Sequence, residues 1–136
     1  QIDAYAFCDT QIRNLQLPDN VRAIGEEAFC TEEISGNMKT IKLSAKLKTI
    51  GKWAFSGQKF TELTIPSNVE KIGSYAFSGC QSLNKIVIKS KKLKKIGPLA
   101  FETIGHNAVI YVPQEKEQEY REMLRSAAPA VQIIAQ

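Results

Sequence analysis

His106 is the only histidine of the 136-residue chain, and it stands in the segment Gly105-His106-Asn107 without a motif partner. Nucleophilic and metal-dependent hydrolases commonly use histidine as a general base. We expect His106 to be a solvated loop residue. The sequence therefore indicates no catalytic residue and no cofactor, and it predicts a protein that is not an enzyme.

The three cysteines, Cys8, Cys30 and Cys80, are the other residues able to do covalent chemistry. Their number is odd, and none has a CxxC or Cys/His spacing, so neither a disulfide framework nor a zinc site is favoured. Each follows an Ala-Phe pair, in a turn where buried thiols often fill small gaps. We expect structural packing for the cysteines. The alternative, in an oxidising compartment, is a bridge between Cys8 and Cys30 across adjacent coils.

The net charge of +4 comes from one stretch of the chain. Six lysines lie between Leu83 and Gly97, where there is no acid, and without them 12 basic residues stand against 14 acidic ones. Such local basicity does not indicate a nucleic-acid partner. The run could attract an acidic protein, a heparin-like glycan or an anionic surface, although a solubilising edge of one coil is the simpler interpretation. Besides Lys85, the candidate basic patch contains Lys89, Lys91, Lys92, Lys94 and Lys95.

The composition predicts one soluble domain, with 43% hydrophobic and 24% charged residues. A chain of this length can bury roughly two thirds of its unfolded surface without a metal or a disulfide. No window approaches the ~18 uninterrupted apolar residues of a membrane helix, so we expect no membrane insertion. The first residue is Gln1, without signal-peptide features. We expect a processed chain or a fragment, which leaves the compartment open.

Two short phrases repeat along the chain and position these residues. The phrase Ile-Gly-x-x-Ala-Phe, or a close variant, occurs five times, and its phenylalanines are spaced by 22, 26, 22 and 24 residues. An apolar-x-apolar phrase, often followed by proline, falls between the copies. Units of about 23 residues cannot bury a core alone and must stack, which predicts a solenoid. The phenylalanines are Phe7, Phe29, Phe55, Phe77 and Phe101.

The alternating phrase predicts one short strand in each coil, and the stacked strands form a parallel sheet. The residues between the inward apolar positions then point outward in two columns. One end of these columns is apolar, at Val87, Val109 and Tyr111, and apolar outward residues often mark a contact surface. Coverage of this end by the C-terminal tail is an equal alternative. The candidate binding surface is Asn14, Gln16, Thr40, Lys42, Glu62, Thr64, Lys85, Val87, Val109 and Tyr111.

The Ile-Gly-x-x-Ala-Phe phrase is expected to cross the opposite, outer side of each coil. Its glycine permits a change in the sign of φ, its alanine lets coils approach, and its phenylalanine fills the core. A single helical or 3₁₀ turn is the expected local form. The longest spacing between phenylalanine and the next strand predicts a polar loop at 31–37.

The pattern ends after Pro113, which divides the chain into a repeat array at 1–113, of about five units, and a C-terminal cap at 114–136. Residues 114–125 predict an amphipathic helix with acids early and Arg125 late, as the helix dipole favours. Its apolar residues would cover the last coil, and 131–134 could add a short strand. The array begins inside a repeat, so we expect further repeats or a cap upstream.

The segment Phe60–Cys80, FTELTIPSNVEKIGSYAFSGC, resembles the BspA-like, or Treponema-type, leucine-rich repeat of bacterial surface proteins. The consensus of that family is approximately LxxIxIPxxVxxIGxxAFxGC, and the resemblance covers residues 2–113. It implies an α/β leucine-rich repeat solenoid with a parallel sheet on the concave side, helical or 3₁₀ turns outside and a C-terminal capping helix. The family has no shared catalytic residue.

The resemblance also implies a secreted or cell-surface protein with a role in adhesion, because family members have been linked to adhesion and protein binding. We expect a binding module for a protein or glycan ligand, which could be host-derived. A structural spacer without a specific ligand is the alternative, because function inferred from fold alone is associational. We expect a monomer, although an exposed strand edge could pair two copies.

Overall fold

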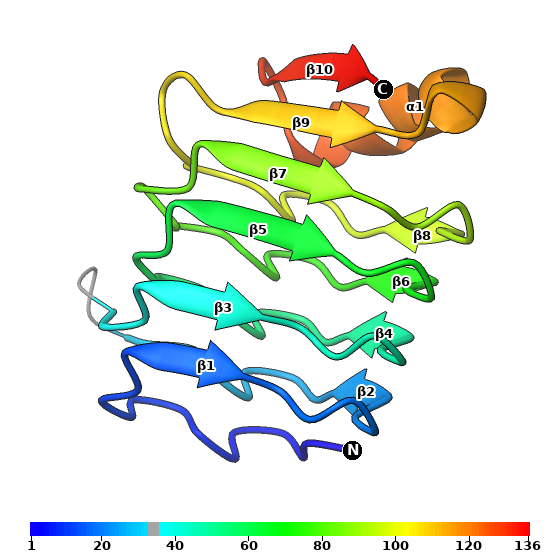
Figure 1. The fold of residues 1–136 in the computed structure, drawn as a ribbon. Coiled ribbons are helices and arrows are strands. Elements are labelled where there is room, and N and C mark those ends of the chain that lie inside the picture. Colours follow the sequence, from blue (N-terminus) through cyan, green and yellow to red (C-terminus); the bar gives the residue numbers. More distant parts are fainter. Residues whose placement is uncertain (33–35) are drawn as a thin grey trace.

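The computed structural model describes residues 1–32 and 36–136, so residues 33–35 of the expected polar loop lie outside the description. The chain winds into a solenoid, and the longer strands of its coils lie side by side (Figure 1). This confirms the predicted parallel-stranded architecture. We call these strands the long-strand face: β1 (Asn14–Gln16), β3 (Thr40–Lys42), β5 (Glu62–Ile65), β7 (Lys85–Ile88), β9 (Val109–Val112) and β10 (Gln132–Ala135).

All pairs on the long-strand face are parallel, and equivalent residues of successive coils are partners. β1 pairs with β3, and β5, β7, β9 and β10 form a four-stranded sheet in that order. β3 and β5 lie side by side without a shared ladder. The inward residues Leu63, Ile65 and Ile86 are at most 2% exposed. Because side chains alternate along a strand, this burial turns the residues between them outward.

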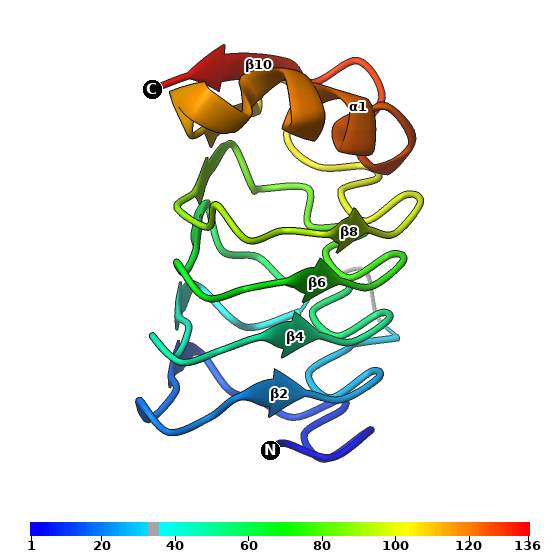
Figure 2. The same cartoon turned by 90° about the vertical axis from the view of Figure 1, so that its right-hand side faces the viewer.

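A second parallel sheet, which the sequence did not lead us to expect, lies on another side of the solenoid (Figure 2). Each of its two-residue strands buries an isoleucine and exposes or half-exposes the residue before it. Such strands are too short to show alternation in the sequence. They pair because the coils stack in register. The short-strand sheet consists of β2 (Ala23–Ile24), β4 (Thr49–Ile50), β6 (Lys71–Ile72) and β8 (Lys95–Ile96).

The Ile-Gly-x-x-Ala-Phe segments form tight turns where we expected a turn of helix. The amide of Glu27 donates to the carbonyl of Lys52 at 2.8 Å, and that of Phe29 to Ala54 at 2.8 Å. Alternate amides therefore bond to the next coil and cannot form consecutive helical bonds. The positive φ falls two residues after the glycine, so the expectation that glycine supplies it is wrong. Within these five segments, positive φ values of 53–59° occur at Tyr5, Glu27, Trp53, Tyr75 and Leu99.

The glycines are needed instead because the backbones of neighbouring coils touch. A Cβ added at Gly51 would lie 2.5 Å from the carbonyl carbon of Gly25, and one at Gly73 would lie 2.6 Å from that of Gly51. Backbone does not yield as a flexible side chain does. The alanines of the same turns, Ala54 and Ala76, are fully buried, which confirms that small residues let the coils approach.

The predicted phenylalanine positions form a continuous ladder through the core. Phe29 and Phe55 stack with ring centroids 5.1 Å apart, and Phe77 and Phe101 stack at 5.3 Å. These four rings are at most 1% exposed. Phe7 continues the ladder, 5.2 Å from Phe29, but it is 41% exposed.

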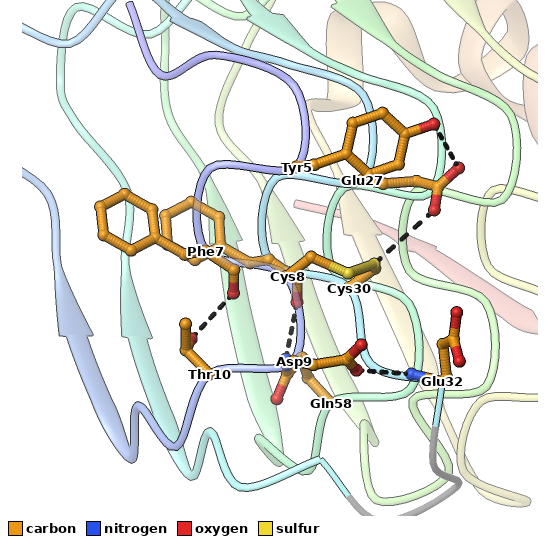
Figure 3. Close-up of a disulfide and its surroundings, with 10 residues drawn as sticks. Tyr5, Phe7, Cys8, Asp9, Thr10, Glu27, Cys30, Glu32 and Gln58 are labelled. Atoms are coloured by element: carbon orange, nitrogen blue, oxygen red, sulfur yellow. Dashed lines mark hydrogen bonds between the residues drawn. A yellow bond between two sulfur atoms is a disulfide. The ribbon is translucent and has the colours of Figure 1, made fainter.

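Cys8 and Cys30 form a disulfide, which contradicts the packing role that we expected for both (Figure 3). Stacked coils place these equivalent positions with Cα atoms 4.9 Å apart, within the range that a disulfide spans. The structure thus shows the alternative given above, a bridge between Cys8 and Cys30 across adjacent coils. Cys80 lies two positions further along its own turn and is free and fully buried. Its thiol donates to the carbonyl of Phe55 at 3.2 Å, as packing predicts.

The C-terminal segment forms the 3₁₀ helix η1 (Gln114–Lys116), the helix α1 (Glu117–Ala127) and strand β10. α1 packs beside the last coils and buries Tyr120 and Leu124 completely. The hydroxyl of Tyr120 donates to the carbonyl of Ser90 at 2.9 Å and accepts the amide of Leu93 at 3.1 Å. In the part of the chain that the structure describes, no helix is long and apolar enough to cross a membrane.

Candidate binding surface

The structure gathers the ten predicted surface residues into two outward columns on the long-strand face. Asn14 and Thr40 are partners, as are Glu62 and Lys85, and Lys85 and Val109 continue the first column. The hydroxyl of Thr40 donates to the amide oxygen of Asn14 at 2.7 Å. The second column runs through Gln16, Lys42, Thr64, Val87 and Tyr111.

The apolar end of this face is not covered by the C-terminal tail. β10 pairs with β9 as the next strand, with Ile134 beside Tyr111 and Gln132 beside Val109. Val87, Val109, Tyr111 and Ile134 are each partly exposed. The alternative in which the tail shields these residues is therefore wrong, and the tail adds Ile134 to the apolar patch. The sequence signal for Ile134 was the short predicted strand at 131–134, whose outward residues we had not assigned to the site.

A hollow with a volume of about 510 Å³ adjoins the place where the ladder is interrupted between β3 and β5. It brings together Lys42 and Thr64 of the two columns with Lys89 of the predicted basic patch. The sequence had placed these residues in two separate groups. Their neighbours in the lining are Ile41, Leu43, Ala45, Pro66, Ser67 and Asn68.

The predicted basic patch is divided among several surroundings, and several of its charges have partners. Lys91 forms a salt bridge with Glu115 of η1, and Lys94 forms one with Glu70 at 2.7 Å. The ammonium of Lys92 donates to the amide oxygen of Asn68 at 2.7 Å. Lys89 lines the hollow, whereas Lys95 belongs to the short-strand sheet. The six-lysine run is therefore not one continuous basic surface.

Both acidic partners of these lysines are stabilised in their charged form. The hydrogen bond from Lys94, followed by its charge, holds the pKa of the Glu70 carboxyl below its usual range. The hydrogen bond from Lys91 likewise lowers the pKa of Glu115. Both carboxyls are at the surface, so salt will screen these pairs.

The reactive groups do not converge on a site. His106 is exposed, as expected. Burial raises the pKa of the Cys80 thiol to about 12, so it remains protonated and is a poor nucleophile. Within residues 1–32 and 36–136 there is no group of three or more metal-ligating side chains. What the long-strand face offers is hydrogen bonding, charge and apolar contact.

The comparisons with known proteins agree with this geometry. The family described as "BspA type Leucine rich repeat region" matches residues 1–122 in six copies. The chain is similar in structure to the pneumococcal vaccine antigen PcpA, with a TM-score of 0.64 and 21% identity over 99% of this chain and 39% of that one. It is also similar to a leucine-rich repeat protein from Bacteroides ovatus ATCC 8483, with a TM-score of 0.63 and 20% identity over 98% and 44% of the respective chains.

At this level of identity the two structures show the fold alone. The chain spans less than half the length of either neighbour. No curated protein matches it.

Proposed function

The chain belongs to the BspA type of leucine-rich repeat proteins, and from this premise we propose that it is a non-catalytic binding module of a secreted or surface protein. Its long-strand face contacts a protein or a glycan, and adhesion is the process that such a contact would serve. The module acts as a monomer and needs no cofactor.

The observation that best supports this proposal is the apolar end of the long-strand face. Val87, Val109, Tyr111 and Ile134 are neighbours on paired strands and remain partly exposed. Contiguous outward apolar residues are typical of contact surfaces, and tyrosine is among the residues enriched there. This end favours a protein ligand.

The alternative function is a spacer that projects other domains and binds nothing. A spacer would be served by similar exposed residues in every coil. Along one column of the long-strand face, however, Thr40, Glu62, Lys85 and Val109 follow one another. This change of character from coil to coil supports binding over spacing.

A surface or extracellular location is part of the proposal. Disulfides persist mainly in oxidising compartments, and Cys8 and Cys30 form one. One structural neighbour is a pneumococcal vaccine antigen, which supports the same location.

The test is binding of the purified chain to a panel of extracellular-matrix proteins and mucin glycans at physiological salt. We expect saturable binding to at least one protein of the panel, and a double variant Val87→Ser/Tyr111→Ser should weaken it by about tenfold or more, as central apolar contacts do. Tyr5→Ser is the matched control, because Tyr5 is 57% exposed but lies on a turn away from this face.

Loss in the double variant with an unchanged control would support the assignment. Equal loss in both variants would remove the long-strand face from consideration. No binding across the panel would favour the spacer.

A further inference from the structure

The short-strand sheet carries a groove on its outer surface. The groove has a volume of about 360 Å³ and runs across β2, β4, β6 and β8. Figure 2 shows this sheet facing the viewer, with the long strands on a different side of the solenoid. The groove is thus separate from the binding surface proposed above.

Glycine creates the floor of this groove. Gly51, Gly73 and Gly97 line it, and a side chain at Gly51 or Gly73 would meet the backbone of the preceding coil within 2.6 Å. Gly51 and Gly73 are partly exposed, whereas Gly97 is buried, so the floor is open at two successive coils. The hydroxyl-bearing Thr49 and Ser74 lie beside this floor. These two hydroxyls can form hydrogen bonds with a ligand in the groove, whereas the amides of Gly51 and Gly73 already donate to isoleucine carbonyls of the preceding coil at 2.8 Å.

Two lysines of this groove lie side by side without an acidic partner. Lys71 and Lys95 are register partners on β6 and β8, and both line the groove. Neither forms a salt bridge with any residue that the structure describes. Like charges directly opposite one another on paired strands are destabilising. An anion in the groove would relieve this repulsion.

The neighbouring column adds to the positive field. Backbone hydrogen bonds between successive coils link the four residues of this column, which are Arg22, Lys48, Glu70 and Lys94. Glu70 is the one acid of that column, and it is already engaged by Lys94. The surroundings of the groove therefore keep a net positive charge, which attracts anions and is screened by salt.

We propose that this groove binds a linear acidic polysaccharide, such as a sulfated glycan chain. Lys71 and Lys95 are in register on successive strands, about 4.8 Å apart, so together they can contact neighbouring anionic groups of such a chain. The hydroxyls of Thr49 and Ser74 beside the cations suit the many hydroxyl groups of a sugar. Nucleic acid fits less well because single strands bind mainly by stacking bases on free aromatic faces. Here the rings of Trp53 and Tyr75 stack on each other with centroids 4.1 Å apart, so the facing surfaces of both rings are occupied.

The test compares two double variants with the same change of charge. Lys71→Gln/Lys95→Gln removes the groove cations, whereas Lys39→Gln/Lys59→Gln removes two exposed lysines that precede β3 and β5. Binding is measured for heparin, desulfated heparin and a DNA duplex at physiological salt. We expect the full chain to bind heparin, the groove variant to bind it roughly thirtyfold more weakly, and the control variant to change less than threefold.

Desulfated heparin, which keeps only its carboxylates, should compete much more weakly than heparin, and the DNA duplex should bind more weakly than heparin. Equal losses in the two variants, or no heparin binding by the full chain, would overturn the proposal. Equal affinity for DNA, lost in the same variant, would reassign the groove to polyanions in general and overturn the glycan assignment. The Val87→Ser/Tyr111→Ser variant should bind heparin normally. The proposal for the groove and the proposal for the long-strand face can therefore fail independently.

Discussion

Phe7 and Phe101 occupy the same position in the first and last coils, but Phe7 is 41% exposed and Phe101 only 1%. In the last coil, the amide of Phe101 donates to the carbonyl of Ala127 of α1 at 2.8 Å, and α1 also buries Tyr120 and Leu124 completely. In the first coil the Cys8–Cys30 disulfide ties the turn to the second coil. Backbone hydrogen bonds hold both regions, but the last coil adds a buried core, whereas the first coil adds a covalent bond beside a half-exposed ring.

This difference follows from the nearest-neighbour nature of a solenoid. Each coil is stabilised mainly by the coils it touches, so local burial determines the cost of a local change. A disulfide stabilises a different quantity, because it restricts the unfolded chain and does not require a buried surface. The same repeat position can therefore contribute very differently in two coils.

The largest expected effect comes from removing a ring at each end of the ladder. Phe101→Ala should lower the free energy of unfolding by about 3–5 kcal/mol, because it leaves a cavity in a closed core. Phe7→Ala should lower it by only about 1–2 kcal/mol, because much of that ring already contacts water. Urea unfolding of the two variants measures both values. Equal losses would show that local burial does not govern the two coils.

Removing the disulfide should have the next largest effect, confined to the first coils. Cys8→Ser/Cys30→Ser opens a loop with a sequence separation of 22, for which chain entropy gives about 3 kcal/mol. Hydrogen exchange should accelerate at the amides of Phe7 and Asp9, which bond to Ala28 and Cys30, and remain slow in β7 and β9. Uniform acceleration along the chain would contradict local coupling between coils.

Cys80 provides an internal control in the same variant. Its thiol is fully buried and its pKa is raised to about 12. Thiol reagents should therefore modify it only when the region around Phe55 and Phe77 unfolds. Rapid labelling of Cys80 in the double variant would show that the opening extends beyond the first coils.

The regular spacing of the sequence predicted the structural features that recur in every coil. Fixed intervals placed the strands, the phenylalanine ladder and the outward columns, because stacked coils bring equivalent positions together. The same reasoning gave the bridge between Cys8 and Cys30 as the alternative to packing, because both directly follow a ladder phenylalanine. The odd count of cysteines was given more weight than this shared position.

Two kinds of feature were not predicted from the sequence. One kind consists of very short segments, and the other of contacts between residues at different positions of the repeat. The two-residue strands of the short-strand sheet carry no alternation pattern, so the groove beside Lys71 and Lys95 could not be expected. The pair between Lys91 and Glu115 joins a loop of one coil to the C-terminal segment, and no repeat interval relates them. The lysine run looked continuous because the sequence does not show how its members divide among the faces.

The smallest expected effect is a pH dependence of the C-terminal region that the disulfide-linked first coil does not share. Lys91 lowers the pKa of Glu115 in the folded chain. The pair therefore stabilises the fold at pH values above the unfolded glutamate pKa of about 4.3. This stabilisation is lost as the pH falls through the lower pKa of the folded chain. NMR titration of Glu115 should give a pKa that rises with added salt and returns to the usual range in Lys91→Gln. Lys39→Gln is the control and should leave it unchanged. A disulfide does not titrate in this range, so the stability of the Cys8–Cys30 region should not depend on pH in the same way. If acid loosened both ends of the wild-type chain equally, and Lys91→Gln behaved in the same way, the ion pair would not be the feature that distinguishes the two ends.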